Sequence, residues 1–130
     1  LYEGPILVHF WATWCPPCQM EMPELVQFSK TFREKFSGTV VAISIDRNRE
    51  SILDFFSAKE YKRLFNLMKV GASPFVNLWD PDSVVTAKFG TNRYPETYII
   101  NKGHKILGKI VGPQKWNDRE FLAQLEGMLK

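Results

Sequence analysis

The stretch "FWATWCPPCQMEMPEL", residues 10–25, decides the fold. It contains the only two cysteines of the chain, Cys15 and Cys18, with two prolines between them. A bridge between these cysteines would close a very small loop, and small loops constrain the unfolded chain least. A structural staple is therefore a weak explanation, and a metal clip or a reactive dithiol are the alternatives.

The composition predicts one folded domain, residues 1–130. With 45% hydrophobic and 14% aromatic residues, the chain can build a core without help from a disulfide. Its net charge of +3 comes from scattered lysines and arginines, which indicates a solvated surface and not a nucleic-acid interface. No apolar run approaches the roughly 18 residues that span a bilayer. Because the chain begins almost directly with a strand, we expect any signal or anchor to lie outside these residues.

Apolar periodicity predicts strands that alternate with helices and then a closing hairpin. The strands are expected at 6–11, 39–45, 74–80, 96–100 and 104–112. Helices are expected from Cys15 to Gly38, from about Ser51, from about Ser57 with a Ser57–Glu60 capping box, before Gly90, and from about Asp118 to Leu129 with Asn117 as the cap. Early alternation predicts parallel pairing, and the hairpin adds antiparallel strands. The result is a mixed central sheet covered on both faces.

Side-chain spacing within these helices predicts the core. Leu25 and the stripe Phe28–Phe32–Phe36 share one helix face, and Pro23 is expected to kink that helix. We expect Trp116 in the core, and the four apolar residues Phe121, Leu122, Leu125 and Leu129 on the inner face of the last helix. Met20 and Met22 are expected to pack and not to bind a ligand.

The position of Cys15 before a helix favours its thiolate, because the positive end of the helix dipole lies there. A thiolate is the nucleophile of disulfide exchange. Cys18 lies one turn further on, close enough for a disulfide but more shielded. We therefore expect Cys15 to attack a partner's disulfide and Cys18 to resolve the mixed disulfide.

A metal site is the alternative chemistry. Zinc needs about four ligands, but the chain offers only two cysteines and two histidines. His104 lies in the distant hairpin and His9 in the first strand. We therefore expect no metal and no cofactor other than the Cys15–Cys18 pair, because a strand that runs into Cys-x-x-Cys at a helix start is typical of a thioredoxin-like redox site.

Three segments resemble a known family. "VHFWATWCPPC" resembles the active-site segment of the thioredoxin superfamily. "QMEMPEL" is similar to the TlpA/ResA/DsbE branch, which carries a glutamate and a proline at the positions of Glu21 and Pro23, and "RYPETYIINKGHKIL" resembles the same branch. The resemblance covers nearly the whole chain. It implies an α/β thioredoxin-like fold with an insert near residues 47–74, after the second strand.

The resemblance also implies roles for single residues. Pro95 in "YPET" matches a cis proline that faces the dithiol, although from sequence alone it is equally an ordinary loop proline. In that fold the backbone of Tyr94 pairs with an extended substrate segment. The match favours a tuning or proton-transfer role for Glu21 over a solvated helix charge.

Two residues near the cysteines carry weaker hypotheses. Trp11 and Trp14 are both compatible with packing, and because Trp14 adjoins Cys15 we expect it on the docking surface. His9 lies where thioredoxins carry a buried aspartate, so its side chain should point inward beneath the dithiol. A neutral imidazole there can accept the proton of Cys18. The alternatives are a packed histidine bonded to a backbone carbonyl, or proton acceptance by Glu21.

The two prolines, Pro16 and Pro17, predict the direction of the chemistry. They have no N–H groups to steady a Cys15 thiolate, so only the Cys18 N–H and side chains remain. Losing such a hydrogen bond disfavours the thiolate and favours the disulfide. We therefore expect a reducing protein.

The sequence thus predicts a thiol–disulfide oxidoreductase that reduces protein disulfides. The resemblance implies a periplasmic or other extracytoplasmic location with a signal or anchor, substrates such as apocytochrome c, and a membrane electron donor. We expect a monomer that binds no nucleic acid. The alternatives are a tryparedoxin-like or general disulfide reductase, since "WCPPC" also occurs there, and a redox-inert binding module. A glutaredoxin is disfavoured, because no glutathione-binding Gly-Gly segment follows Pro95.

Overall fold

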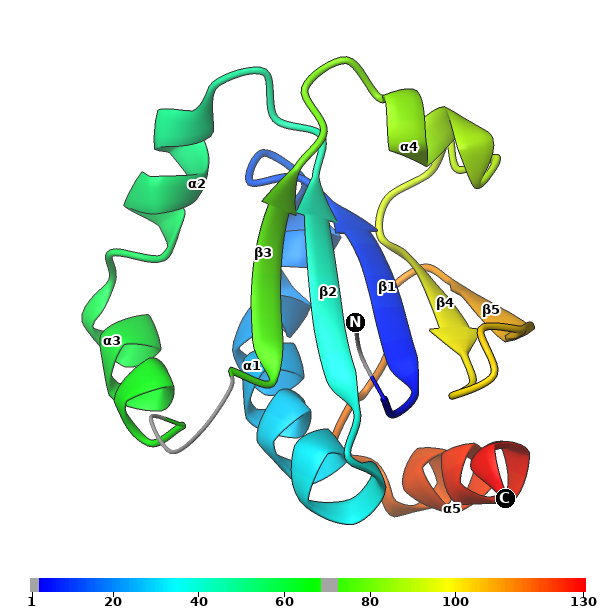
Figure 1. The fold of residues 1–130 in the computed structure, drawn as a ribbon. Helices are drawn as coiled ribbons and strands as arrows, with labels where there is room; N and C mark the ends of the chain where they lie inside the picture. The colour runs from blue at the N-terminus through cyan, green and yellow to red at the C-terminus, as the bar shows by residue number, and fades with distance from the viewer. Residues whose placement is uncertain (1–2, 69–72) are drawn as a thin grey trace.

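A five-stranded mixed sheet organises the computed structural model, which describes residues 3–68 and 73–130 (Figure 1). The strands lie in the order β3-β2-β1-β4-β5. Their bounds are β1 Ile6–Trp11, β2 Thr39–Ser44, β3 Phe75–Trp79, β4 Glu96–Ile100 and β5 Ile106–Val111. The pairs β1–β2 and β2–β3 are parallel, and β1–β4 and β4–β5 are antiparallel. The predicted mixed sheet is therefore confirmed.

Helices connect and cover the strands as the periodicity predicts. Their bounds are α1 Pro16–Phe36, α2 Arg49–Phe55, α3 Lys59–Asn66, α4 Val84–Lys88 and α5 Arg119–Leu129. The helices α2 and α3 form the predicted insert between β2 and β3, of which residues 69–72 lie outside the described residues. Helix α1 continues through Pro23 as one element.

The predicted first residue or N-cap of three helices is wrong by one residue or more. The capping box fails because the Ser57 hydroxyl donates to the Asp54 carbonyl at 2.6 Å, so α3 begins after Ala58 without a side-chain cap. Asp118 and not Asn117 caps α5. Helix α2 begins two residues before Ser51, because Asn48 accepts from the Glu50 N–H at 2.9 Å.

The end of α1 also differs from the prediction. Ser37, not Gly38, adopts the left-handed conformation that closes the helix, with φ of 56°. Gly38 is required for a different reason, since a Cβ atom there would collide with the ring of Phe32. The glycine thus permits a close approach between the chain and the core.

The larger core lies between the sheet and α1, α2, α3 and α5. Alternation along β1 turns Leu7, His9 and Trp11 to this face, where the Phe28–Phe32 pair and Trp116 are fully buried. On the opposite face Val8 and Phe10 form a smaller cluster together with Val41, Ile43 and Tyr98, and Phe89 at the end of α4 packs against it. Both faces of the sheet therefore carry apolar packing. The predicted core positions on α1 and α5 are confirmed.

Candidate active site

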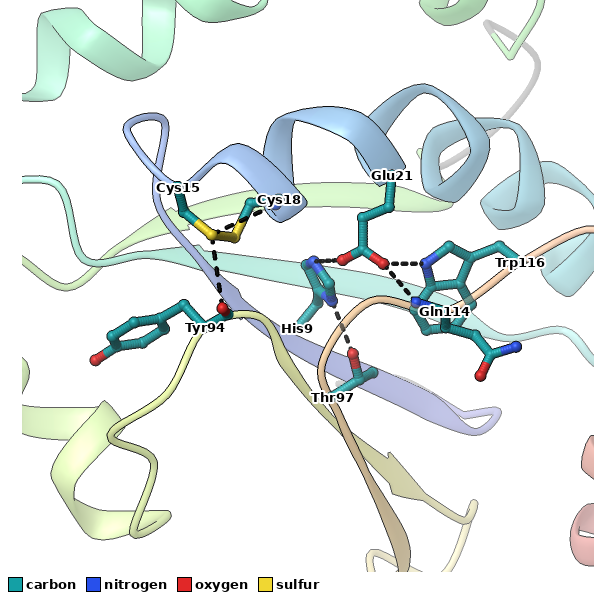
Figure 2. A network of polar contacts seen from close by, with 8 residues as sticks. All are labelled: His9, Cys15, Cys18, Glu21, Tyr94, Thr97, Gln114 and Trp116. Carbon is teal, nitrogen blue, oxygen red and sulfur yellow. Dashed lines mark hydrogen bonds and ion pairs between the residues drawn. A yellow bond between two sulfur atoms is a disulfide. The ribbon is translucent and has the colours of Figure 1, made fainter.

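Cys15 and Cys18 form a disulfide at the start of α1 (Figure 2). Cys15 is the N-cap residue, and Pro16 and Pro17 occupy the first helical positions. The Cys18 N–H donates to the Cys15 Sγ at 3.4 Å. Both cysteines are nearly or fully buried. The helix start thus presents one sulfur with a single backbone donor, as the two prolines predict.

The loop before β4 faces this disulfide. The Tyr94–Pro95 peptide bond is cis, as the resemblance implies. The Tyr94 carbonyl oxygen lies 3.6 Å from the Cys15 Sγ. Burial, followed by the nearby carboxylates of Asp80 and Glu96, raises the pKa of the Tyr94 phenol above its ordinary value. The phenol is therefore neutral across the physiological pH range.

Trp14 projects into solvent from the loop between β1 and α1. It is 61% exposed, and its one ring contact among the described residues is an edge contact with Tyr94, at 6.4 Å between ring centroids. Packing is therefore the wrong explanation for Trp14, although it is right for the fully buried Trp11. A cleft of ≈ 950 Å³ lies beside Trp14, between the loops that follow β2 and β3. The indole of the residue before Cys15 thus lines an open cleft.

Asp46, at the floor of this cleft, holds the loop that carries Trp14. Its carboxylate accepts the Thr13 N–H at 3.0 Å and the Thr13 hydroxyl at 2.6 Å, and it also accepts from the Ser44 hydroxyl. The Asp46 carbonyl accepts the Trp79 indole N–H at 2.6 Å. Sequence reasoning missed Asp46, because its partner in the loop is 33 residues away.

Beneath the disulfide, His9 and Glu21 form a buried pair. The His9 Nε2 lies 3.1 Å from the Glu21 Oε1, and the side chains are 0% and 4% exposed. The inward orientation of His9 is confirmed. Its partners are side chains and not a backbone carbonyl, since its Nδ1 lies 2.8 Å from the Thr97 hydroxyl. A solvated helix charge is the wrong interpretation of Glu21.

Three residues that sequence reasoning did not assign to the site complete this network. The Trp116 indole N–H donates to the Glu21 Oε2 at 3.0 Å, and the Gln114 N–H donates to the same oxygen at 2.9 Å (Figure 2). Thr97 faces His9 across the β1–β4 pair. The strand register is the only sequence-level signal that could have found Thr97, and no local pattern indicates the role of Trp116.

A second buried glutamate lies on the other face of the sheet. Glu96 is 3% exposed and pairs with the Lys109 ammonium at 3.3 Å. Burial disfavours the charged form of Lys109, but hydrogen bonds to Glu96 and Tyr98 and the charges of these two groups outweigh that effect, so the pKa of Lys109 is raised above its ordinary value. Glu96 follows Pro95 directly, so both faces of the sheet bring a carboxylate close to the site.

The remaining predicted residues lie elsewhere. Met22 is buried, but Met20 is 84% exposed on α1, so packing is the wrong explanation for Met20. His104 lies in the β4–β5 turn, away from the dithiol, with φ of 67°. The structure therefore gathers Cys15, Cys18 and His9 with the residues Glu21, Tyr94 and Pro95.

Comparison with known proteins assigns the family. The model of the AhpC/TSA family matches residues 1–108. The chain belongs to the AhpC/TSA family. Among curated relatives, the thiol:disulfide interchange protein DsbE homologue of Paracoccus denitrificans is 31% identical over 128 residues, covering 97% of this chain and 62% of that protein. The thiol-disulfide oxidoreductase ResA of Bacillus anthracis is 26% identical over 125 residues, covering 96% and 61%.

Solved structures share the fold of this AhpC/TSA family member. A DsbE-type thiol:disulfide interchange protein of Chlorobium tepidum superposes with a TM-score of 0.77 at 22% identity, covering 99% of this chain and 82% of that one. StoA of Bacillus subtilis gives 0.71 at 20% identity, covering 97% and 84%. The resemblance to thioredoxin-like proteins of the ResA and DsbE type is thus confirmed.

Length separates the chain from its curated relatives. It spans about three-fifths of the ResA and DsbE proteins that it matches. Within residues 3–68 and 73–130, no helix is both long and apolar enough to cross a membrane.

Proposed function

We propose that this protein is a thiol–disulfide oxidoreductase that acts on protein disulfides through the Cys15–Cys18 pair. The observation that carries the proposal is the placement of the Cys15 Sγ between the start of α1 and the Tyr94 carbonyl, at 3.6 Å. A substrate strand that pairs with the Tyr94 backbone would present its own disulfide to Cys15. The names of the curated relatives, an oxidoreductase and an interchange protein, support the same chemistry.

The reaction transfers two electrons from the dithiol to the substrate. The Cys15 thiolate attacks one sulfur of the substrate disulfide, and the other substrate sulfur leaves as a thiolate and takes up a proton. The Cys18 thiol then loses its proton and attacks the Cys15 Sγ. This step forms the Cys15–Cys18 disulfide and releases the second substrate thiolate, which is protonated in turn. The redox group is the cysteine pair itself, and the proposal needs no cofactor.

The His9–Glu21 pair is proposed to accept the Cys18 proton. Cys18 and Glu21 are three residues apart on α1 and so share a helix face. The Glu21 Oε1 and the His9 Nε2 have no other hydrogen-bond partner among the described residues, and 3.1 Å separates them. A base without competing donors can take a proton and pass it across this distance.

The two prolines support a reducing role. In the described residues the Cys18 N–H is the one backbone donor to the Cys15 Sγ, because Pro16 and Pro17 have none. Weak support for the thiolate favours the disulfide, so the reduced protein gives up electrons readily. We expect a reduction potential nearer thioredoxin's, about −270 mV, than DsbA's, about −120 mV.

The biological setting is proposed from the resemblance to the ResA and DsbE proteins. We propose an extracytoplasmic, monomeric reductase that receives electrons from a membrane thiol reductase. Cysteines such as those of apocytochrome c are the proposed substrates. A tryparedoxin-like or general reductase is the alternative within the same chemistry. Partners trapped on Cys15 in the native compartment by a Cys18→Ser variant would separate the two.

The decisive experiment is dithiothreitol-driven reduction of insulin. The wild type is expected to catalyse it, Cys15→Ser to lose all catalysis, and Cys18→Ser to accumulate mixed disulfides on Cys15. Alkylation of the reduced protein at mild pH should modify Cys15 before Cys18. If the wild type fails to react with any disulfide, the correct interpretation of the protein is a redox-inert binding module.

A further inference from the structure

The connection between β5 and α5 contacts helix α1, which carries the dithiol at its start. This connection directs three backbone or indole N–H groups at two glutamates of α1. Gln114 and Trp116 donate to the Glu21 Oε2 at 2.9 and 3.0 Å, and the Asn117 N–H donates to the Glu24 Oε1 at 3.1 Å. The contact to Glu21 is the buried one, and it lies one helical turn from Cys18.

These donors give the two carboxylate oxygens of Glu21 different surroundings. Two N–H groups donate to Oε2, whereas in the described part of the chain the one polar partner of Oε1 is the His9 Nε2, at 3.1 Å. Hydrogen bonds to a carboxylate favour its ionised form, which is the form that accepts a proton. The donors also fix the carboxylate plane, so that Oε1 stays turned toward His9.

We propose that Trp116 is a positioning residue for the dithiol chemistry. Together with the Gln114 amide, its indole N–H holds the Glu21 carboxylate in place by Oε2 and leaves Oε1 alone to exchange the Cys18 proton with His9. This inference rests on the proposed disulfide exchange. It gives a role to a tryptophan whose burial alone would indicate nothing but core packing.

Packing fixes the indole in the place that this role needs. Trp116 is fully buried, with ring centroids 5.3 Å from Phe28, 5.4 Å from Phe121 and 6.0 Å from His9. These contacts use the ring and not the N–H. A phenylalanine at position 116 therefore keeps most of the packing and removes the donor.

Few ionisable groups face Glu21, so the effect of Trp116 can be read from pH dependence. His9 approaches from β1, and Cys18 lies on the same helix face. Thr97 from β4 reaches Glu21 only through His9, and it carries no charge. Gln114 and Trp116 on the connection are also uncharged.

The test follows the two steps separately with dithiobis(nitrobenzoate) and reduced protein. The first nitrothiobenzoate released reports the attack by Cys15, and the second reports resolution by Cys18. We expect Trp116→Phe to move the pH midpoint of the second release upward by about one unit, because a charge-assisted donor is lost. The pH profile of the first release should not change.

A matched control is available in Trp11, which is also fully buried. Among the described residues its indole nitrogen has no hydrogen-bond partner. Trp11→Phe should therefore leave both pH profiles in place. If Trp11→Phe moves the second midpoint as far as Trp116→Phe does, packing and not the hydrogen bond is responsible, and the proposal is wrong.

Repeating the substitution in a protein that also carries Glu21→Gln shows whether the effect of Trp116 depends on the Glu21 carboxylate. In a Glu21→Gln protein, Trp116→Phe should cause no further movement of the midpoint. An unmoved midpoint in the single Trp116→Phe variant, or an equal movement in both backgrounds, would overturn the proposal. If Trp116→Phe does not fold, Gln114→Pro removes the other donor to Oε2 and should move the midpoint in the same direction. Absence of any first release in the wild type would instead count against the proposed disulfide exchange.

Discussion

Glu21 and Glu96 are two buried carboxylates on opposite faces of one sheet. They are 6% and 3% exposed, so burial does not distinguish them. Glu21 faces a histidine and two neutral N–H donors, whereas Glu96 faces the ammonium of Lys109, which reaches in from the surface. A histidine titrates near neutral pH and a lysine does not.

The chemistry of the partner indicates which of the two carboxylates is suited to move a proton. An imidazole partner can receive or return a proton during turnover, whereas the Lys109 ammonium has no proton to give up near neutral pH. The raised pKa of Lys109 keeps its ammonium protonated to a still higher pH. Burial of a carboxylate beside a redox site is therefore not enough to assign a role in proton transfer, because the chemistry of the partner decides it.

The largest expected effect comes from neutralising each carboxylate in turn. Glu21→Gln should slow the resolution step about 100-fold, since general acid–base catalysis typically contributes that much or more. Glu96→Gln should leave the same step within about twofold, because no proton passes through Glu96. Single-turnover release from a mixed disulfide on Cys15 measures both. Equal slowing in the two variants would show that charge near the site matters and that the partner does not.

His9 provides the next largest effect. His9→Phe should slow resolution about tenfold while sparing the attack by Cys15, because Glu21 then holds the proton alone. His9→Asn is the matched variant, since an amide can hydrogen-bond to Glu21 but does not titrate. If His9 carries the proton, asparagine will not restore the rate. A resolution rate and pH profile that stay unchanged in His9→Phe would make His9 a core residue only.

Asp80 extends the comparison to a buried carboxylate that, among the described residues, accepts hydrogen bonds from Thr86 and Val84 and from no ionisable side chain. Burial raises its pKa, but hydrogen bonds from Thr86, Val85 and Val84 outweigh burial, so the pKa of Asp80 lies below its ordinary value. The Thr86 hydroxyl and N–H donate to one oxygen at 2.7 and 2.9 Å, and the Val84 N–H donates to the other at 3.0 Å. Asp80 thus acts as a cap for α4.

Replacing this cap should change stability and not chemistry. We expect Asp80→Asn to lower the free energy of unfolding by about 1 kcal/mol at neutral pH, as for other helix caps. A lowered pKa stabilises the fold above about pH 4 and loses that contribution as the pH falls below it, so the gap between wild type and variant should close in acid. Urea unfolding at several pH values measures this. A gap that widens in acid would contradict the assignment.

The smallest expected effect concerns Thr97. Thr97→Val keeps the side-chain shape but removes the hydroxyl that lies 2.8 Å from the His9 Nδ1. The ring then loses its anchor on the side opposite Glu21, and we expect resolution to slow about threefold to tenfold, in line with one lost neutral hydrogen bond. Thr91→Val, which removes a buried hydroxyl bonded to Tyr98 on the other face, is the control. Slowing by the control alone would disconnect the hydrogen bond of His9 from the chemistry.

Much of the site could be predicted because it obeys local rules. Cys15 and Cys18 are three residues apart at a helix start, and strand alternation turns His9 inward. The two prolines predict the single backbone donor to the Cys15 Sγ. The helix caps were harder to predict, because the two expected caps have other hydrogen-bond partners. Ser57 donates to a carbonyl of the preceding helix, and Asn117 donates to a glutamate of α1.

Three features could be predicted from the sequence alone: the succession of strands and helices along the chain, the dithiol at a helix start, and the burial of His9. Each of these depends on spacing of a few residues, which backbone geometry converts directly into position. Only the tertiary structure decided what His9 and Glu21 contact. Thr97 is 88 residues from His9, and Trp116 is 95 residues from Glu21. Contacts over such separations depend on sheet register and on the path of the connection before α5, and no local pattern encodes either.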